Sequence, residues 1–270
     1  MSLLLCRREP VTVPYEIEEL GIHIWSSQEL CYVIYNHPLL VMEDFINERL
    51  TAFLRSQLGL PFLAERIEKW IEGRGMSDEL LFLILQECFY YTPQEQTRYR
   101  QEVTVLRKLP TEEFLKRRAD YFYGLKLYGR AAAMYENILE TGSEKTLSAG
   151  FMSRIWNNIA ACYTKLFRYQ KAMHAYDCAY SLEADKDYVK RMYFLTLMEP
   201  EIEMKERYEA LMSEAEKEEW LEEMVKAQSN AEKERPAVEI GQLFEKDPVK
   251  RLSGATELLN KWKVEYRRMI

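Results

Sequence analysis

Hydrophobic residues recur every three to four positions along most of the chain, which is the spacing of helices with one apolar face. The segment 39–59 shows this pattern, and Gly59 is expected to end that helix. Helix start signals agree with the periodicity, because Thr92 and Pro93 precede Glu95 at the spacing of a capping box. The pattern therefore predicts a mainly all-α protein.

A short stretch near the N-terminus has a different, alternating pattern. Apolar residues occupy every second position over 11–17, and Ile22 and Ile24 follow after a turn with one glycine. Alternation on both sides of a turn predicts a small N-terminal β-hairpin near 11–25. Residues 1–108 are thus expected to form a helical region with one hairpin, and they resemble no known family.

Two segments in the middle of the chain, 115–138 and 156–179, match each other 41 residues apart without a gap. Each is predicted to form two helices joined by a short turn, near Leu127 in one and near Arg168 in the other. Alanines lie where two helix axes approach closely, and aromatic residues fill the space beside them. The predicted repeat-packing residues are Leu115, Ala119, Phe122, Ala131, Tyr135, Trp156, Ala160, Tyr163, Ala172, Tyr176 and Ala179.

The second of these segments resembles the tetratricopeptide repeat. The residues that carry the match are Trp156, Ile159, Ala160, Tyr163, Ala172, Tyr176 and Ala179. The spacing of 41 residues exceeds the family's period of about 34, because the connection over 141–150 is longer. A degenerate third unit follows. The resemblance implies an α-α superhelix, a tetratricopeptide-like solenoid, over 109–198.

In this family the first helix of each pair lines a concave face that binds peptides. The resemblance therefore implies a peptide-binding groove, in which exposed Asn157 and Asn158 suit hydrogen bonds to a peptide backbone. Two alternatives stay open: the two asparagines are only solvated, or the chain's own helices fill the groove. The candidate groove residues are Lys116, Asp120, Tyr123, Arg154, Asn157, Asn158, Lys165 and Arg191.

One version of the family binds a C-terminal carboxylate with a set of Lys, Asn and Arg side chains. The corresponding positions here hold Lys116, Asp120, Asn158, Tyr188 and Met192. Only Lys116 and Asn158 fit that set, and Asp120 would repel a carboxylate. A carboxylate-clamp ligand is therefore not expected.

The C-terminal region, 199–270, is predicted to form one long acidic helix that caps the repeats, followed by two further helices. Residues 199–235 include 13 acidic and 6 basic residues, whereas 246–270 include 7 basic and 3 acidic ones. We interpret the acidic run as a solvated helix face. A dock for a basic partner, or for the chain's own basic C-terminus, is the alternative.

Composition narrows the classes of partner. The net charge of −7 argues against general nucleic-acid binding, which needs a clustered basic face. The longest apolar run, 80–85, is far too short to cross a membrane. Five cysteines at irregular spacings indicate a reducing compartment, and the N-terminus lacks the features of a signal peptide. The protein is expected to be cytoplasmic, with no nucleic-acid or membrane partner.

Cys162, His174 and Cys178 form the most chemically suggestive set, because His174 and Cys178 are one helical turn apart. A zinc site needs four ligands and usually a close cysteine pair, which these spacings do not provide. We therefore interpret them as structural residues. His23 and His37 suggest no catalytic triad, so no catalytic residue, metal or cofactor is expected.

These observations predict a non-catalytic protein- or peptide-binding scaffold or adaptor that uses the concave face of tetratricopeptide repeats. A peptide-responsive regulator that changes conformation on binding is the alternative. An enzyme with dispersed catalytic residues is the less favoured one. The sequence does not identify the partner, the pathway or the oligomeric state.

Overall fold

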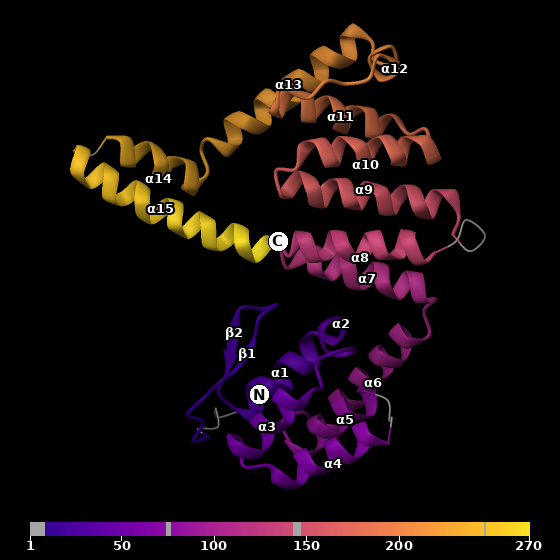
Figure 1. The fold of residues 1–270 in the computed structure, drawn as a ribbon, viewed down its shortest axis with the longest axis vertical. Coiled ribbons are helices and arrows are strands. Elements are labelled where there is room, and N and C mark those ends of the chain that lie inside the picture. The colour runs from indigo at the N-terminus through magenta and orange to yellow at the C-terminus, as the bar shows by residue number, and fades with distance from the viewer. Residues whose placement is uncertain (1–8, 74–76, 143–146, 246) are drawn as a thin grey trace. The chain divides into compact units, whose positions relative to one another are not determined.

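The computed structural model describes residues 9–73, 77–142, 147–245 and 247–270. These residues form fifteen helices and one two-stranded sheet, so the all-α class with a small hairpin is confirmed (Figure 1). The contacts divide the chain into two compact units, Met1–Tyr121 and Phe122–Ile270. The three regions expected from the sequence, 1–108, 109–198 and 199–270, stay a prediction.

The hairpin of the first unit lies within the predicted segment. Strands β1 (Tyr15–Ile17) and β2 (Ile22–Ile24) are antiparallel, with Tyr15 opposite Ile24. Tyr15 and Ile24 are buried, and the ring of Tyr15 contacts those of Phe45 and Phe53, with centroids 6.2 Å and 5.5 Å away. The buried face of the hairpin therefore joins the core of the first unit.

Helices make up the rest of the first unit. Thr92 and Glu95 form the predicted capping box, since each side chain accepts a hydrogen bond from the other residue's N–H group. The helices are α1 (Ser27–Asn36), α2 (Pro38–Val41), α3 (Glu48–Ser56), α4 (Pro61–Glu72), α5 (Ser77–Glu87), α6 (Pro93–Arg107) and α7 (Thr111–Gly124), which continues into the second unit.

The prediction of a single helix over 39–59 is wrong. The chain leaves the helical conformation after α2 and begins a new helix, α3, at Glu48. Asn47 is extended, and its side-chain oxygen accepts a hydrogen bond from the N–H of Leu50 at 3.1 Å. A capping asparagine satisfies a helix N-terminus and so favours a break at this position.

Arg107 connects three parts of the first unit. Its Nε and Nη2 donate to the two carboxylate oxygens of Asp78 at 2.8 Å and 2.9 Å. It also donates to Glu43 at 2.8 Å and to the carbonyl oxygen of Met42 at 2.7 Å. Because Asp78 is only 6% exposed, this bidentate pair compensates a carboxylate that has lost most of its water.

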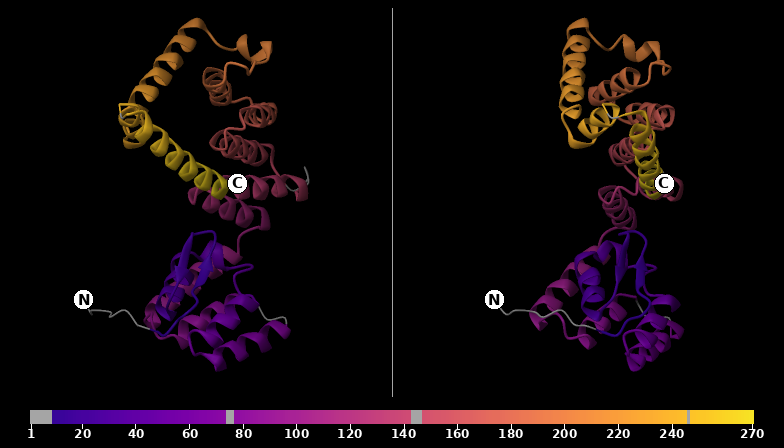
Figure 2. Two further views of the ribbon diagram at one scale, coloured as in Figure 1. Left: turned by 60° about the vertical axis from the view of Figure 1, so that its left-hand side comes forward. Right: turned by 90° about the vertical axis from the view of Figure 1, so that its left-hand side faces the viewer.

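The second unit contains a stack of helices followed by a segment that leaves the stack and returns. Helices α8 to α11 each pack on the next, α13 packs on α11, and α15 returns to the start of α8 (Figures 1 and 2). The helices are α8 (Tyr128–Thr141), α9 (Ala149–Lys165), α10 (Tyr169–Leu182), α11 (Lys186–Met198), α12 (Glu206–Glu209), α13 (Glu214–Ala231), α14 (Arg235–Phe244) and α15 (Pro248–Met269).

Most of the predicted repeat-packing residues are inside the protein. Ala131, Ala160, Ala172 and Ala179 have no exposed surface, and this permits close contact between helices such as α9 and α10. The buried set is Ala119, Phe122, Ala131, Tyr135, Ala160, Ala172, Tyr176 and Ala179. The half-buried set is Leu115, Trp156 and Tyr163.

The turns before α8 and α10 have the same backbone geometry. Lys126 and Phe167, each the residue before a predicted turn position, have φ angles of 63° and 58°. The N–H of Leu127 bonds the carbonyl of Phe122 at 3.0 Å, and the N–H of Arg168 bonds that of Tyr163 at 2.9 Å. Two sequence segments 41 residues apart therefore end their first helices in the same way.

The long acidic helix expected in the C-terminal region is present as α13 and is followed by two further helices, but its expected start just after residue 200 is wrong. The chain forms only the short α12 before α13 begins at Glu214. Ser213 and Glu216 make a capping box at this point, and it fixes the start of α13.

Asp177 on α10 holds the segment before α13 in place. Its carboxylate accepts hydrogen bonds from Lys205 at 2.8 Å, from the Tyr208 hydroxyl at 2.5 Å and from Arg207. Burial raises the pKa of Asp177, but the hydrogen bonds from Lys205, Tyr208 and Arg207 outweigh it and lower the pKa to about 2. The carboxylate is therefore ionised at neutral pH.

Candidate functional site

The candidate site follows one face of α9. Its residues Arg154, Asn157, Asn158 and Lys165 recur at the three-, four- and seven-residue steps that keep side chains on one helix face. Arg154 and Lys165 are exposed and the two asparagines are half-buried. With a rise of about 1.5 Å per residue, this face extends about 16 Å. We call these four residues, together with Arg191 of α11, the α9 stripe.

Arg191 brings α11 into the stripe. Its Nη1 donates to Oδ1 of Asn157 at 2.7 Å, and Nδ2 of Asn157 donates to Oδ1 of Asn158 at 3.3 Å. These two hydrogen bonds fix the orientation of three polar side chains that all keep some exposure to solvent. Such a row presents amide and guanidinium donors to a ligand with little loss of rotamer freedom.

Arg191 affects the pKa of two tyrosines. Burial raises the pKa of Tyr176, and Arg191 and Thr164 oppose the rise. Burial likewise raises the pKa of Tyr123, again opposed by Arg191. Both phenols are thus protonated at neutral pH. Arg191 therefore bonds Asn157, adjoins Tyr176 and acts electrostatically on Tyr123.

The other predicted groove residues have different surroundings. Lys116 and Asp120 lie in the first unit and form an ion pair at 2.7 Å, one turn apart on α7. Arg154 and Lys165 lie at opposite ends of the α9 stripe. Six of the eight predicted groove residues therefore lie in the second unit: Tyr123, Arg154, Asn157, Asn158, Lys165 and Arg191.

Two of the carboxylate-clamp positions are inside the protein. Tyr188 is 7% exposed and Met192 is not exposed. The hydroxyl of Tyr188 is engaged by Ser153, whose Oγ donates to it at 3.0 Å. These two positions cannot contact a ligand carboxylate.

Sequence reasoning missed the polar contributions of Tyr176 and Thr164. Tyr176 was assigned only to packing, although its ring is buried while its hydroxyl adjoins Arg191. Thr164 lies seven residues after Asn157, so helix periodicity alone would have placed it on the stripe.

His174 and Cys178 are in contact, and the surroundings of Cys178 favour its neutral thiol. Nε2 of His174 and Sγ of Cys178 are 3.7 Å apart, and burial raises the pKa of the Cys178 thiol. Cys162 is not exposed. Within the described ranges no three His, Cys, Asp or Glu residues are arranged to hold a metal ion.

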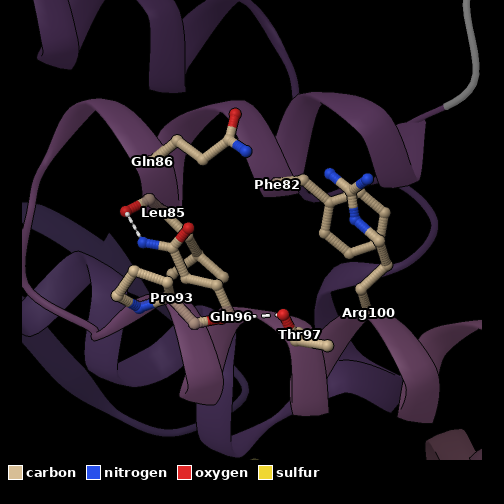
Figure 3. A pocket seen from close by; sticks show the side chains of 7 residues that line it. All are labelled: Phe82, Leu85, Gln86, Pro93, Gln96, Thr97 and Arg100. Atoms are coloured by element: carbon tan, nitrogen blue, oxygen red, sulfur yellow. Dashed lines mark hydrogen bonds between the residues drawn. The ribbon is translucent and has the colours of Figure 1, made fainter.

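A cavity of about 250 Å³ between α5 and α6 is a separate candidate (Figure 3). Three of its polar side chains, those of Gln96, Thr97 and Arg100, have partners within the protein. Gln96 donates to the carbonyls of Leu85 and Tyr91 at 3.3 Å and 2.9 Å, and Arg100 lies 4.5 Å from the centre of the Phe82 ring. The cavity is therefore best described as a seam between two packed helices.

Comparison of the chain with protein-family models, with curated proteins and with solved structures found no match. None of the helices in the described parts of the chain combines the length and the apolar character needed to cross a membrane.

Proposed function

We propose that this protein is a non-catalytic scaffold or adaptor that binds a protein or peptide through the α9 stripe. The observation that carries the proposal is the hydrogen-bonded row from Arg191 through Asn157 to Asn158. Its donors and acceptors are oriented by the fold yet partly exposed, which is the arrangement that recognises an extended peptide backbone.

The internal repeat supports this proposal. The resemblance to the tetratricopeptide repeat assigns α9 and α10 to one helix pair, and the matching turns at Lys126 and Phe167 give the preceding pair the same local geometry. In that architecture the stripe lies on the first helix of a pair, which is the peptide-binding element.

Charge narrows the class of ligand. Arg154, Lys165 and Arg191 give the α9 stripe three positive charges, while Asn157 and Asn158 are neutral. Positive groups at both ends of a row of amides favour a peptide with acidic side chains. The ligand is engaged along its length and not through a terminal carboxylate.

The α15 helix favours a second candidate function, a regulator that changes conformation when a peptide binds. None of its described residues is buried, and the Tyr266 hydroxyl near its C-terminal end donates a hydrogen bond to the carbonyl of Leu166 at 3.4 Å. A ligand that binds better when this helix is displaced would shift the population of the two states.

We also propose a cytoplasmic location. Cys31, Cys88, Cys162 and Cys178 form no disulfide within the described part of the chain, and three of them are buried. Persistent free cysteines are typical of a reducing compartment.

The proposal is tested by affinity capture from the native lysate with wild type, Asn158→Glu and the control Lys233→Glu. The carboxylate at position 158 would repel an acidic ligand and disrupt the row, whereas Lys233 is exposed and outside the stripe. We expect a partner that wild type and the control retain and Asn158→Glu loses. Retention of every partner by a variant with an unchanged circular dichroism spectrum would refute the proposal.

A further inference from the structure

The last helix has an unusual amount of exposed surface. Among the described residues of α15 none is buried, although the helix is 22 residues long. It carries six basic and two acidic side chains, a difference of +4. An amphipathic helix is stabilised mainly by the face that it buries against another surface. The apolar and charged side chains of α15 are therefore accessible to a ligand.

Two neighbouring pockets form where the end of α15 meets the two equivalent turns. The first, about 390 Å³, is lined by Phe167, Trp262, Glu265, Tyr266 and Met269. The second, about 290 Å³, is lined by Leu125, Lys126, Glu265, Arg268 and Met269. Since both contain Glu265 and Met269, they are adjacent parts of one surface, which we call the α15 groove.

The first pocket suits a large apolar side chain. Three of its five residues are aromatic and Met269 adds a polarisable thioether. Phe167 is 68% exposed and Trp262 is 39% exposed, so these rings have much surface left to cover. Pockets lined by aromatic residues are the usual anchor points of peptide interfaces.

The second pocket is positively charged. Lys126 and Arg268 face it with one carboxylate, Glu265, and the whole of α15 is basic. Two cations against one anion attract an acidic group and repel a basic one. A partner that fits both pockets therefore combines an apolar residue with nearby acidic residues.

The two turns supply complementary halves of the groove. Lys126 and Phe167 occupy equivalent positions with positive φ, where glycine is the favoured residue. Neither position is a glycine: one places a cation in the second pocket and the other places an aromatic ring in the first. A strained backbone that carries a side chain into a pocket is an arrangement found at binding sites.

We propose that the α15 groove is a second binding surface, which takes an acidic peptide segment with one large apolar anchor. The anchor enters the pocket of Phe167, Trp262 and Tyr266, and acidic side chains of the peptide face Lys126 and Arg268. This surface consists of residues outside the α9 stripe, and its occupation does not require the stripe to bind a ligand.

A random peptide library displayed on phage, selected on the full-length protein, provides the probe. We expect the enriched sequences to contain an aromatic or large aliphatic residue flanked by Asp or Glu. The affinity of an enriched synthetic peptide is then measured by fluorescence polarisation for wild type and four variants. Trp262→Ser and Lys126→Glu alter the groove, and Phe244→Ser and Lys250→Glu are controls.

Each control makes the same kind of change as its groove variant, an aromatic residue to serine or a lysine to glutamate. Phe244 is 62% exposed and lies on α14. Lys250 is on α15 itself, about 27 Å from Arg268 along the helix axis. We expect each groove variant to weaken binding about tenfold or more, each control to change it less than about twofold, and added salt to weaken it.

Asn158→Glu separates this proposal from the function proposed for the α9 stripe. The enriched peptide should bind this variant as it binds wild type, even if the stripe has no ligand. Enrichment of basic or of purely apolar sequences, no enrichment at all, or equal affinity for Lys126→Glu and Lys250→Glu would each overturn the proposal.

Discussion

Lys126 and Phe167 lie 41 residues apart and hold the same left-handed backbone conformation, with φ angles of 63° and 58°. Each follows the first helix of a pair, and each is succeeded by a residue whose N–H bonds a carbonyl five positions earlier. The sequence repeat is therefore also a repeat of local structure. Neither residue is a glycine, so each turn includes a conformational cost.

Replacing either turn residue by glycine should stabilise the protein. Lys126→Gly and Phe167→Gly relieve the steric cost of a positive φ, and the greater entropy of the unfolded chain offsets part of the gain. We expect an increase of up to about 1 kcal/mol in the free energy of unfolding, measured by urea denaturation. Phe167→Gly should also lose the aromatic wall of the α15 groove. Destabilisation by both variants would contradict the assigned turn geometry.

Ala172→Glu should strongly destabilise the second unit. Ala172 has no exposed surface and lies on α10, which packs against α9, so the carboxylate would be buried without a partner. We expect a loss on the order of 3–5 kcal/mol in the free energy of unfolding. The control Gln170→Glu adds the same charge at an exposed position of α10. Equal stability of the two variants would refute close packing at Ala172.

Removal of the Arg107 side chain should destabilise the first unit. Arg107→Ala leaves Asp78, which is 6% exposed, without its bidentate partner. We expect a loss of about 3 kcal/mol, because an uncompensated charge remains inside the protein. Arg98→Ala, an exposed position on the same helix, should change the stability by less than about 0.5 kcal/mol. Chemical denaturation of both variants checks the difference.

Acid should weaken the contact between Asp177 and the segment before α13. The folded-state pKa of Asp177, about 2, lies below the ordinary value of 3.8. Its contribution to stability is therefore fully present above about pH 4 and is lost as the pH falls towards 2. The loss relative to neutral pH should be about 2 kcal/mol. Asp177→Asn should remove this part of the pH dependence when the free energy of unfolding is measured by urea denaturation between about pH 2 and pH 7. If the free energies of unfolding of wild type and variant fell in parallel as the pH is lowered, the role assigned to Asp177 would be contradicted.

Gly129→Ala should displace the end of α15. A β-carbon at Gly129 would overlap the main chain of Ile270, although alanine itself is the better residue inside a helix by about 1 kcal/mol. We expect faster hydrogen exchange in the last two turns of α15 and an unchanged rate in α9 and α10. Unchanged exchange in α15 would show that this contact is not formed in solution.

The sequence predicted helices well where start signals and periodicity coincided. The Thr92–Glu95 capping box and the two helix pairs are examples. It failed where an apolar pattern continued across a helix boundary. In both failures a capping residue, Asn47 or Ser213, determined the break. The spacing of Ser213 and Glu216 was visible in the sequence, so that second break could have been predicted.

Helix periodicity could predict only the part of the candidate site that lies on a single helix. Spacing placed Arg154, Asn157, Asn158 and Lys165 on one face of α9. The hydrogen bond from Arg191 joins residues 34 positions apart, so local pattern could not establish it. The α15 groove depends on contacts over still longer separations, such as the 100 residues between Leu166 and Tyr266.

The most direct test of the central claim is site-specific photo-crosslinking from the α9 stripe. A photoreactive amino acid is introduced in place of Asn158, and in a control in place of the exposed Lys233, and adducts are mapped by mass spectrometry in the native lysate. Our account predicts an adduct with an acidic peptide segment of a partner at position 158 and none at 233. The same adducts at both positions, or none at 158 in a folded variant, would contradict it.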